Sequence, residues 1–220
     1  MGSISLESIL ATTDLSTFKS TLESSNCKRC SLCEQDVRIV VSRGALDAQV
    51  MLVGEAPGAV EDQCGQPFSG PAGELLDKAF AAANINTNLE LYITNVCKCR
   101  PIAPEFSGKQ NYTPRAEQRR QCLPYLLHEI ALLNPSIVVA CGAVAAEALF
   151  LIKQPKMSQL AGRVIDISVP VLQDKICYVM YHPAYVLHQR QGGQEVYTKA
   201  RKALWEQILT LKELMYGRAI

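Results

Sequence analysis

The sequence is poor in histidine and aromatic residues, and it has no excess of charge of either sign. Its 220 residues include three histidines and one tryptophan, and all aromatic residues together make up 6%. Lysine and arginine total 22 against 21 acidic residues, which leaves a net charge of +1. This balance alone argues neither for nor against a nucleic-acid partner, because a few well-placed donors suffice for a local phosphate-binding surface.

The chain also has no long hydrophobic run and no secretory signal. No apolar stretch approaches the roughly 20 residues that a membrane-spanning helix needs. The first ten residues lack a basic region followed by an apolar segment. We therefore expect a cytoplasmic protein with no membrane partner. A hydrophobic content of 48% is ample for a core, and 220 residues suit one sizeable domain, so we predict a single domain over residues 1–220.

Short apolar runs alternate with longer segments of helical periodicity. Strands are expected at residues 49–53, 91–96, 136–140 and 176–181, with an edge hairpin at 163–171. Helices are expected at residues 71–83, 113–133, 142–151 and 195–215. This alternation predicts an α/β fold, as a three-layer α/β/α domain with a central, mainly parallel sheet of four strands. An N-terminal helix and a cysteine-containing turn, over about residues 1–36, are expected to pack on this domain.

Three loops that follow predicted strands have unusual sequences. In parallel sheets, such loops carry the chemistry. The first, Gly54-Glu55-Ala56-Pro57-Gly58, is a turn whose backbone amides can face a ligand. The second begins at Asn95, whose amide can pair with a base edge of complementary pattern. The third begins at His182, beside a proline. Each alone is compatible with an ordinary turn, but together they predict a site at one edge of the sheet.

Cysteine is unusually frequent for a chain without a secretory signal. The nine cysteines are an odd number, which argues against a disulfide framework. Six lie in two groups, Cys27, Cys30 and Cys33 in the first and Cys97, Cys99 and Cys122 in the second. This spacing lets thiolates converge on one metal ion or cluster. The other three, Cys64, Cys141 and Cys177, lie in or near apolar segments and are expected to pack in the core.

The order and spacing of these motifs resemble those of the family 4 uracil-DNA glycosylases. The resemblance rests on GEAPG at 54–58, the downstream Glu61-Asp62 and Pro67-Phe68, ITN ending at Asn95, HPAY starting at His182, and the cysteines. It extends from about Cys27 to the C-terminal helix. It implies a DNA repair enzyme, a monofunctional hydrolase that flips uracil out of single- or double-stranded DNA and cleaves its N-glycosidic bond to leave an abasic site. We expect this enzyme to be a monomer.

The resemblance further implies how the base is held. Phe68 is expected to stack on the extruded uracil, and Asn95 to bind its O4 and N3–H edge. Glu61 is expected to fill the space beside C5, where a thymine methyl would lie. The turn at Ala56 is expected to offer backbone amides to the base.

Catalysis and DNA insertion are assigned by the same resemblance. His182 is expected to donate a hydrogen bond to O2, where negative charge grows as the bond breaks. Glu55 is the candidate for positioning the attacking water, because the neighbouring Ala56 cannot act as a base. Val186 or Leu187 is expected to fill the gap that the flipped base leaves.

A [4Fe–4S] cluster is the implied cofactor, with Cys27, Cys30, Cys99 and Cys122 as its ligands. Cys33 and Cys97 are extra thiols at positions where the family usually has other residues. The ligands would join the N-terminal segment to the middle of the chain, which favours a structural role for the cluster.

Two alternatives remain open at this point. One is a non-catalytic iron–sulfur or zinc protein that binds nucleic acid or transfers electrons. The other is a glycosylase of the same superfamily that removes a different deaminated base. A type that bonds covalently to DNA through a histidine in an inserted loop is disfavoured, because no histidine lies between Cys99 and Cys122.

Overall fold

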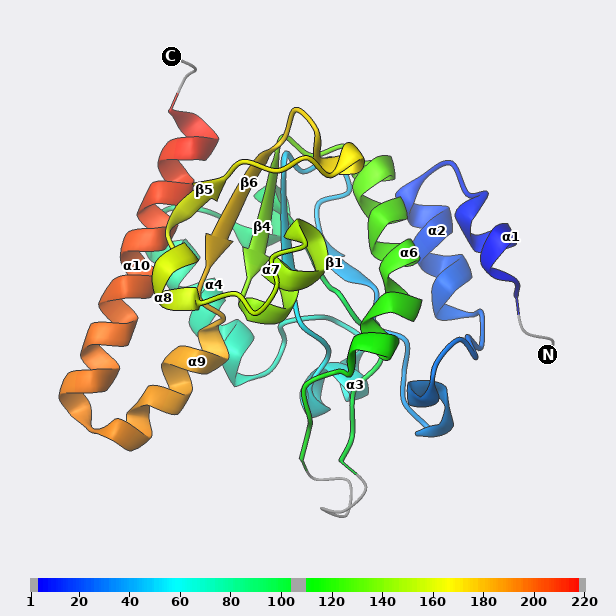
Figure 1. Ribbon diagram of the computed structural model, residues 1–220, viewed down its shortest axis with the longest axis horizontal. Coiled ribbons are helices and arrows are strands. Elements are labelled where there is room, and N and C mark those ends of the chain that lie inside the picture. The colour runs from blue at the N-terminus through cyan, green and yellow to red at the C-terminus, as the bar shows by residue number, and fades with distance from the viewer. Residues whose placement is uncertain (1–3, 104–109, 218–220) are drawn as a thin grey trace.

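The computed structural model describes residues 4–103 and 110–217, and it places one mixed sheet between two layers of helices (Figure 1). The strands are β1 (Ser42–Gly44), β2 (Val50–Gly54), β3 (Leu91–Asn95), β4 (Ile137–Cys141), β5 (Arg163–Ile165) and β6 (Ile176–Met180). Their order across the sheet is β1-β3-β2-β4-β6-β5. Neighbours among β3, β2, β4 and β6 are parallel, whereas β1 and β5 pair antiparallel at the two edges.

The predicted α/β class is confirmed, but the sheet has six strands rather than four. The additional strands are the two edges, each three residues long. Strand β1 has the sequence Ser-Arg-Gly, which carries no apolar alternation. In the segment predicted as a hairpin, only β5 pairs with the sheet, and a 3-10 turn at Pro170–Leu172 follows it.

The helices are α1 (Leu6–Leu10), α2 (Leu15–Glu23), α3 (Ala59–Cys64), α4 (Pro71–Ala82), α5 (Thr87–Glu90), α6 (Ala116–Leu133), α7 (Ala143–Phe150), α8 (Met157–Leu160), α9 (Pro183–His188) and α10 (Gln194–Tyr216). The single N-terminal helix of the prediction is therefore two helices. Asp14 starts the second one, because its carboxylate accepts a hydrogen bond from the Thr17 amide at 2.8 Å. None of the described helices is both long and apolar enough to cross a membrane.

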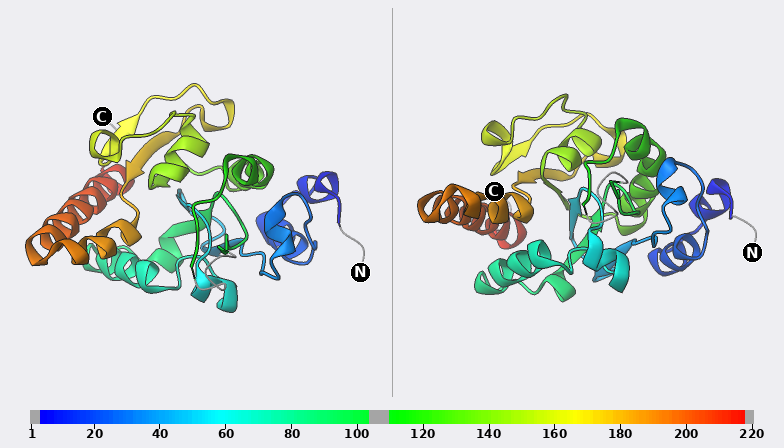
Figure 2. Two further views of the ribbon diagram at one scale, coloured as in Figure 1. Left: turned by 60° about the horizontal axis from the view of Figure 1, so that its bottom comes forward. Right: turned by 90° about the horizontal axis from the view of Figure 1, so that it is seen from below.

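Alternate residues of each central strand face opposite layers, as a pleated strand requires. On one face, residues such as Met51 and Val138 pack with the apolar sides of α6 and α7. On the other face, Leu52 and Val139 pack with α4 and α10. Figure 2 shows these two helical layers with the sheet between them.

The N-terminal helices lie outside this sandwich, against α6 (Figures 1 and 2). Ile9 in α1 and Phe18 and Leu22 in α2 form a small buried cluster with Tyr125 of α6. The Lys19 ammonium also donates to the carbonyl of Ser42 at 2.7 Å. The cysteine-containing segment that follows α2 is thereby held next to the start of α6.

Candidate active site

Loops from three parts of the chain meet where the parallel strands end. Gly54 closes β2 and is paired with Asn95 at the end of β3. The ring of Phe68, from the loop between α3 and α4, lies 5.4 Å from the His182 ring, centroid to centroid. A Cβ atom on Gly54 would lie 2.4 Å from Asn95 Oδ1 and 2.5 Å from Phe68 Cζ. Only glycine fits there, so the missing side chain lets Phe68 and Asn95 approach each other.

A cavity of about 500 Å³, open to solvent, lies beside this meeting point. Predicted site residues on its wall are Glu55, Ala56, Glu61 and His182. Phe68 does not line it, but its ring packs against the ring of His182, which does. Asn95 does not line it either. The three loops therefore converge as predicted, but His182 alone of the three central side chains borders the open cavity.

The side-chain amide of Asn95 makes no hydrogen bond to the described residues, although only 2% of the residue is exposed. Its backbone carbonyl accepts a hydrogen bond from the Lys98 ammonium at 2.9 Å. Within residues 4–103 and 110–217, its side chain has no hydrogen-bond partner, and no buried side-chain nitrogen or oxygen there is sealed off unpaired. The amide edge of Asn95 is thus available to an incoming polar group.

His182 is a neutral hydrogen-bond donor. It follows β6 and caps α9, where its Nδ1 accepts a hydrogen bond from the Ala184 amide at 3.2 Å. Burial lowers the pKa of His182 to about 4, because the charged ring is poorly solvated there. At neutral pH, Nδ1 is therefore unprotonated and Nε2 carries the proton. That N–H can stabilise negative charge that develops on a ligand.

Glu55 is one of two carboxylates on the cavity wall, with Glu61 as the other. Burial raises the pKa of Glu55, while a hydrogen bond from Thr113 and the charge of Arg119 act in the opposite direction. A carboxylate in such surroundings can hold a water molecule and accept its proton.

Glu61 is occupied by backbone amides. Its Oε1 accepts from Ser69 and Gly70 at 3.1 and 2.9 Å, and its Oε2 accepts from Gly58 at 3.1 Å. The carboxylate lines the cavity and is nine-tenths buried. It therefore fixes the loop that carries Phe68 in addition to filling space.

Phe68 adopts a left-handed backbone conformation with φ of +55°. For a bulky residue this conformation costs of order 1–3 kcal/mol, and it persists only where neighbours impose it. One neighbour is Gly73, where a Cβ atom would lie 1.8 Å from the Phe68 carbonyl oxygen. The strained turn directs the ring towards Asn95 and His182.

The predicted wedge needs a correction. Val186 is fully buried between α9 and α10, so it has no surface to insert into DNA. Leu187 is partly exposed and lines a separate groove between α4 and α10. Tyr185 is exposed and stacks on Tyr181 with ring centroids 4.9 Å apart.

Five of the six grouped cysteines line one small cavity. They are Cys27, Cys30, Cys33, Cys99 and Cys122. Their sulfurs receive polar contacts: the Lys98 amide donates to Cys122 Sγ at 3.3 Å, and the Tyr125 hydroxyl lies 3.3 Å from Cys27 Sγ. Among the residues that the structure describes, no three metal-ligating side chains come close enough together for a single ion.

The remaining cysteines behave differently from one another. Cys97 is buried and lies outside this cavity, and the neighbouring thiol of Cys122 raises its pKa. Cys141 and Cys177 are buried in strands, as predicted for packing residues. Cys64 is exposed at the end of α3, so the prediction that it packs in the core is wrong.

Lys98 and Glu129 form a buried ion pair between the two sites, which the sequence analysis missed. Both are almost completely buried, and the Lys98 ammonium contacts a carboxylate oxygen of Glu129 directly. The hydroxyl of Tyr92 donates to the same carboxylate at 2.8 Å. Because Lys98 also binds the Asn95 carbonyl, the pair connects the end of β3 with α6, the helix that carries Cys122.

Comparison with known proteins identifies relatives. The family model "Uracil DNA glycosylase superfamily" matches residues 41–209. The chain is 36% identical to a "Type-4 uracil-DNA glycosylase" of Pyrobaculum aerophilum, over 74% of this chain and 81% of that protein. Proteins of the same name from Thermotoga maritima and Archaeoglobus fulgidus are 35% and 32% identical. These matches cover 76% and 80% of this chain, and 80% and 86% of the two proteins.

Proposed function

The chain belongs to the uracil-DNA glycosylase superfamily, with type-4 enzymes among its relatives, and from this premise we propose that it excises uracil from DNA by hydrolysis. The observation that carries the proposal is the meeting of Phe68, Asn95 and His182 at the ends of three chain segments. These are an aromatic ring, a free amide and a neutral N–H donor. The ring can stack on the face of a single pyrimidine, the amide can pair with its edge, and the N–H donor can stabilise the negative charge on the departing base.

Recognition requires the base to leave the duplex, which costs a few kcal/mol. Stacking on Phe68 would return about 1–3 kcal/mol of this. The amide of Asn95 would accept from N3–H and donate to O4, and this pattern discriminates against cytosine by about 1–3 kcal/mol. Glu61 and the loop that it fixes would leave no room for a thymine methyl, at a cost of about 1–3 kcal/mol to thymine.

Hydrolysis would break the bond between C1′ of the sugar and N1 of the base, with the electron pair leaving on the base. The Nε2–H of His182 would donate to O2 and stabilise that negative charge, helped by backbone amides at Ala56. A water held by Glu55 would form the new bond to C1′. Its released proton would pass through Glu55 or solvent to the departing uracil. The C1′–N1 bond would break before the water attacks, which leaves an oxocarbenium-like sugar. A weak base such as Glu55 is then sufficient to activate the water.

The duplex would be held open by Leu187, which replaces Val186 as the candidate wedge. Leu187 follows His182 closely in the chain and is accessible. Inserted apolar side chains are a common device of proteins that kink or unstack DNA.

The cysteine cavity fits the implied [4Fe–4S] cluster. Four thiols from two distant segments, Cys27, Cys30, Cys99 and Cys122, line one small cavity and receive polar contacts to sulfur. Four cysteine thiolates from two segments are the ligand set that such a cluster takes. A cluster held by four thiolates offers rigid cross-linking, and every reacting group named above belongs to the protein.

Release of uracil from a single-stranded oligonucleotide tests the proposal directly. We expect the unaltered protein to release the base and His182→Ala and Asn95→Ala to release it far more slowly. A panel of uracil, hypoxanthine, xanthine and thymine then defines the lesion. No release of any base by cluster-loaded protein would refute the proposal and favour a non-catalytic nucleic-acid-binding protein. Preferential release of hypoxanthine or xanthine would favour the second alternative.

A further inference from the structure

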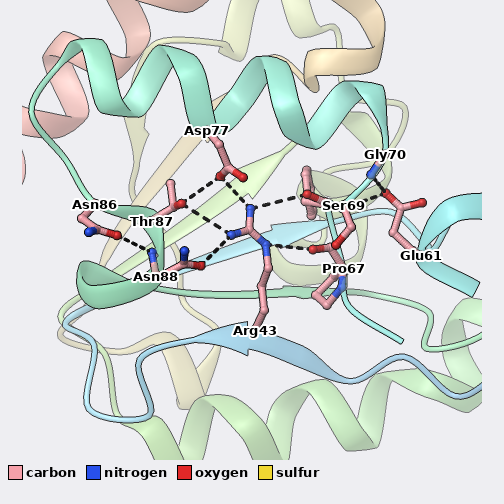
Figure 3. Close-up of polar contacts among 10 residues, drawn as sticks. Arg43, Glu61, Pro67, Ser69, Gly70, Asp77, Asn86, Thr87 and Asn88 are labelled. Carbon is pink, nitrogen blue, oxygen red and sulfur yellow. Dashed lines mark hydrogen bonds and ion pairs between the residues drawn. The ribbon is translucent and has the colours of Figure 1, made fainter. Parts of the chain in front are cut away.

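An arginine on the edge strand β1 reaches across to the loop that carries Phe68 (Figure 3). The Nε of Arg43 donates to the carbonyl of Pro67 at 2.9 Å. One terminal nitrogen donates to the carbonyl of Phe68 at 3.5 Å and to Asp77 of α4 at 2.7 Å. The side chain of Arg43 is only 9% exposed. A charge this well buried needs partners, and here they include the two carbonyls next to the strained residue.

The other terminal nitrogen fixes the plane of the guanidinium. It donates to Asn88 at 3.1 Å and to Thr87 at 3.4 Å. Thr87 in turn donates to Asp77 at 2.8 Å, so the acceptors are themselves held in place. All three nitrogens of Arg43 are therefore engaged in hydrogen bonds, as Figure 3 shows. A lysine has no such fork and could satisfy only part of it.

The loop is thus held from two sides. Arg43 binds the carbonyls of Pro67 and Phe68, and Glu61 binds the amides of Ser69 and Gly70. These two carbonyls and two amides belong to the three consecutive peptide groups from Pro67 to Gly70, and each of the four has a charged partner from outside the loop. Since the left-handed conformation of Phe68 is unfavourable by itself, these partners are what maintains it.

We infer that Arg43 is a positioning residue for uracil excision, which holds the Phe68 ring in the orientation that stacks on the extruded base. This inference rests on the proposed function. Arg43 itself would touch neither the base nor the sugar. Its contribution is the pre-organised orientation of the stacking surface, on which the alignment of the base against His182 depends.

Single-turnover excision in a double-mutant cycle of Arg43→Ala and Phe68→Ala tests the inference. A misplacement of about 1 Å can cost a hundredfold in rate, so we expect Arg43→Ala to lose up to about 100-fold and Arg43→Lys to lose less. In the Phe68→Ala background, removing Arg43 is expected to change the rate by less than about twofold, because no ring is left to position. Binding to DNA with an abasic site is expected to be unchanged, since that DNA presents no base to Phe68.

Arg163 on β5 provides the matched control. It is an exposed arginine on the opposite edge strand, and Arg163→Ala is expected to keep the full rate. If Arg43→Ala fails to fold, Asp77→Asn serves instead, because Asp77 binds Arg43 and its side chain is 41% exposed. This variant is expected to lose part of the rate. A full rate in folded Arg43→Ala, or losses that multiply in the double variant, would overturn the inference. Absence of excision by the unaltered protein would instead refute the proposed function.

Discussion

At the scale of single residues, the proposed reaction depends on the protonation state of His182, which would stabilise the departing base. The half-buried imidazole is neutral at physiological pH because desolvation lowers its pKa to about 4, and its proton is on Nε2 because Nδ1 accepts from the Ala184 amide. A neutral imidazole can donate a hydrogen bond to an anion and needs no neighbouring carboxylate, whereas a buried imidazolium would need one. Burial is the cause of the lowered pKa of His182, and a neighbouring carboxylate would have raised that pKa instead.

We predict that His182→Ala lowers the rate of excision by about 10²- to 10³-fold, the usual cost of one lost donor to a developing oxyanion.

We also predict that the imidazole stays neutral from pH 8 down to about pH 5 and gains a proton only towards pH 4. Nitrogen NMR of labelled histidine, with His182→Ala used to assign the signal, checks this range. An imidazole that protonates between pH 6 and 7 would contradict the assignment of a neutral donor.

Several residues of the site were predictable from their position at strand ends, and others were not. Asn95 and His182 directly follow buried strands, where an α/β fold places its chemistry. Arg43 was missed because its partners lie 24 to 45 residues away, so no local pattern marks it. The choice between Val186 and Leu187 depended on which side of the six-residue α9 packs against α10. The sequence of so short a helix leaves that open.

At the scale of elements, the buried pair of Lys98 and Glu129 joins the end of β3 to α6. Removing one partner of such a pair leaves an unpaired charge in the core, which costs about 3–5 kcal/mol. We therefore predict that Glu129→Leu strongly lowers the midpoint of thermal unfolding of the cluster-loaded protein. Combining it with Lys98→Met removes the stranded ammonium, and most of the stability is expected to return.

A second ion pair on α6 supplies the comparison for this prediction. Arg119 contacts Glu147 of α7 at 3.1 Å, but the Glu147 side chain is 42% exposed. Exposed pairs contribute about 0–1 kcal/mol, so Glu147→Ala is expected to shift the midpoint little. If Glu129→Leu and Glu147→Ala had equal effects, burial would not be what makes the Lys98 pair important.

Secondary structure was predictable where the apolar pattern was long enough to have a period. The four central strands are five-residue runs that are buried on both faces, and all four were found. The Ser-Arg-Gly of β1 is an edge whose pairing depends on β3, almost 50 residues later. The break between α1 and α2 was missed because apolar residues recur with helical spacing on both sides of the Asp14 cap. Tertiary contacts and caps thus decided what periodicity did not.

At the scale of the whole molecule, the cysteine cavity is where the N-terminal segment joins the rest of the chain. Cys27 and Cys30 follow α2, whereas Cys99 follows β3 and Cys122 lies in α6. Outside this cavity, α1 and α2 are attached through the small cluster of Ile9, Phe18 and Leu22 on α6 and through hydrogen bonds such as that of Lys19 to the Ser42 carbonyl. A cluster with ligands from both segments would act as a cross-link, and the proposal of one domain over residues 1–220 depends on it.

We predict that Cys99→Ala loses iron and sulfide together with the visible absorption of a thiolate-bound cluster, and that residues 1–36 then become sensitive to protease. The reason is that the cross-link would be lost, and this segment would then be held by the small apolar cluster and by a few hydrogen bonds such as that of Lys19 to the Ser42 carbonyl. Cys33→Ala is expected to keep the cluster, since the cavity retains Cys27, Cys30, Cys99 and Cys122. Cys64→Ala, at an exposed thiol outside the cavity, serves as the control and is expected to match the unaltered protein in iron content and protease resistance. Loss of iron in Cys33→Ala but not in Cys99→Ala would reassign the ligand. Full protease resistance after loss of iron would show that packing on α6 alone secures the N-terminal segment.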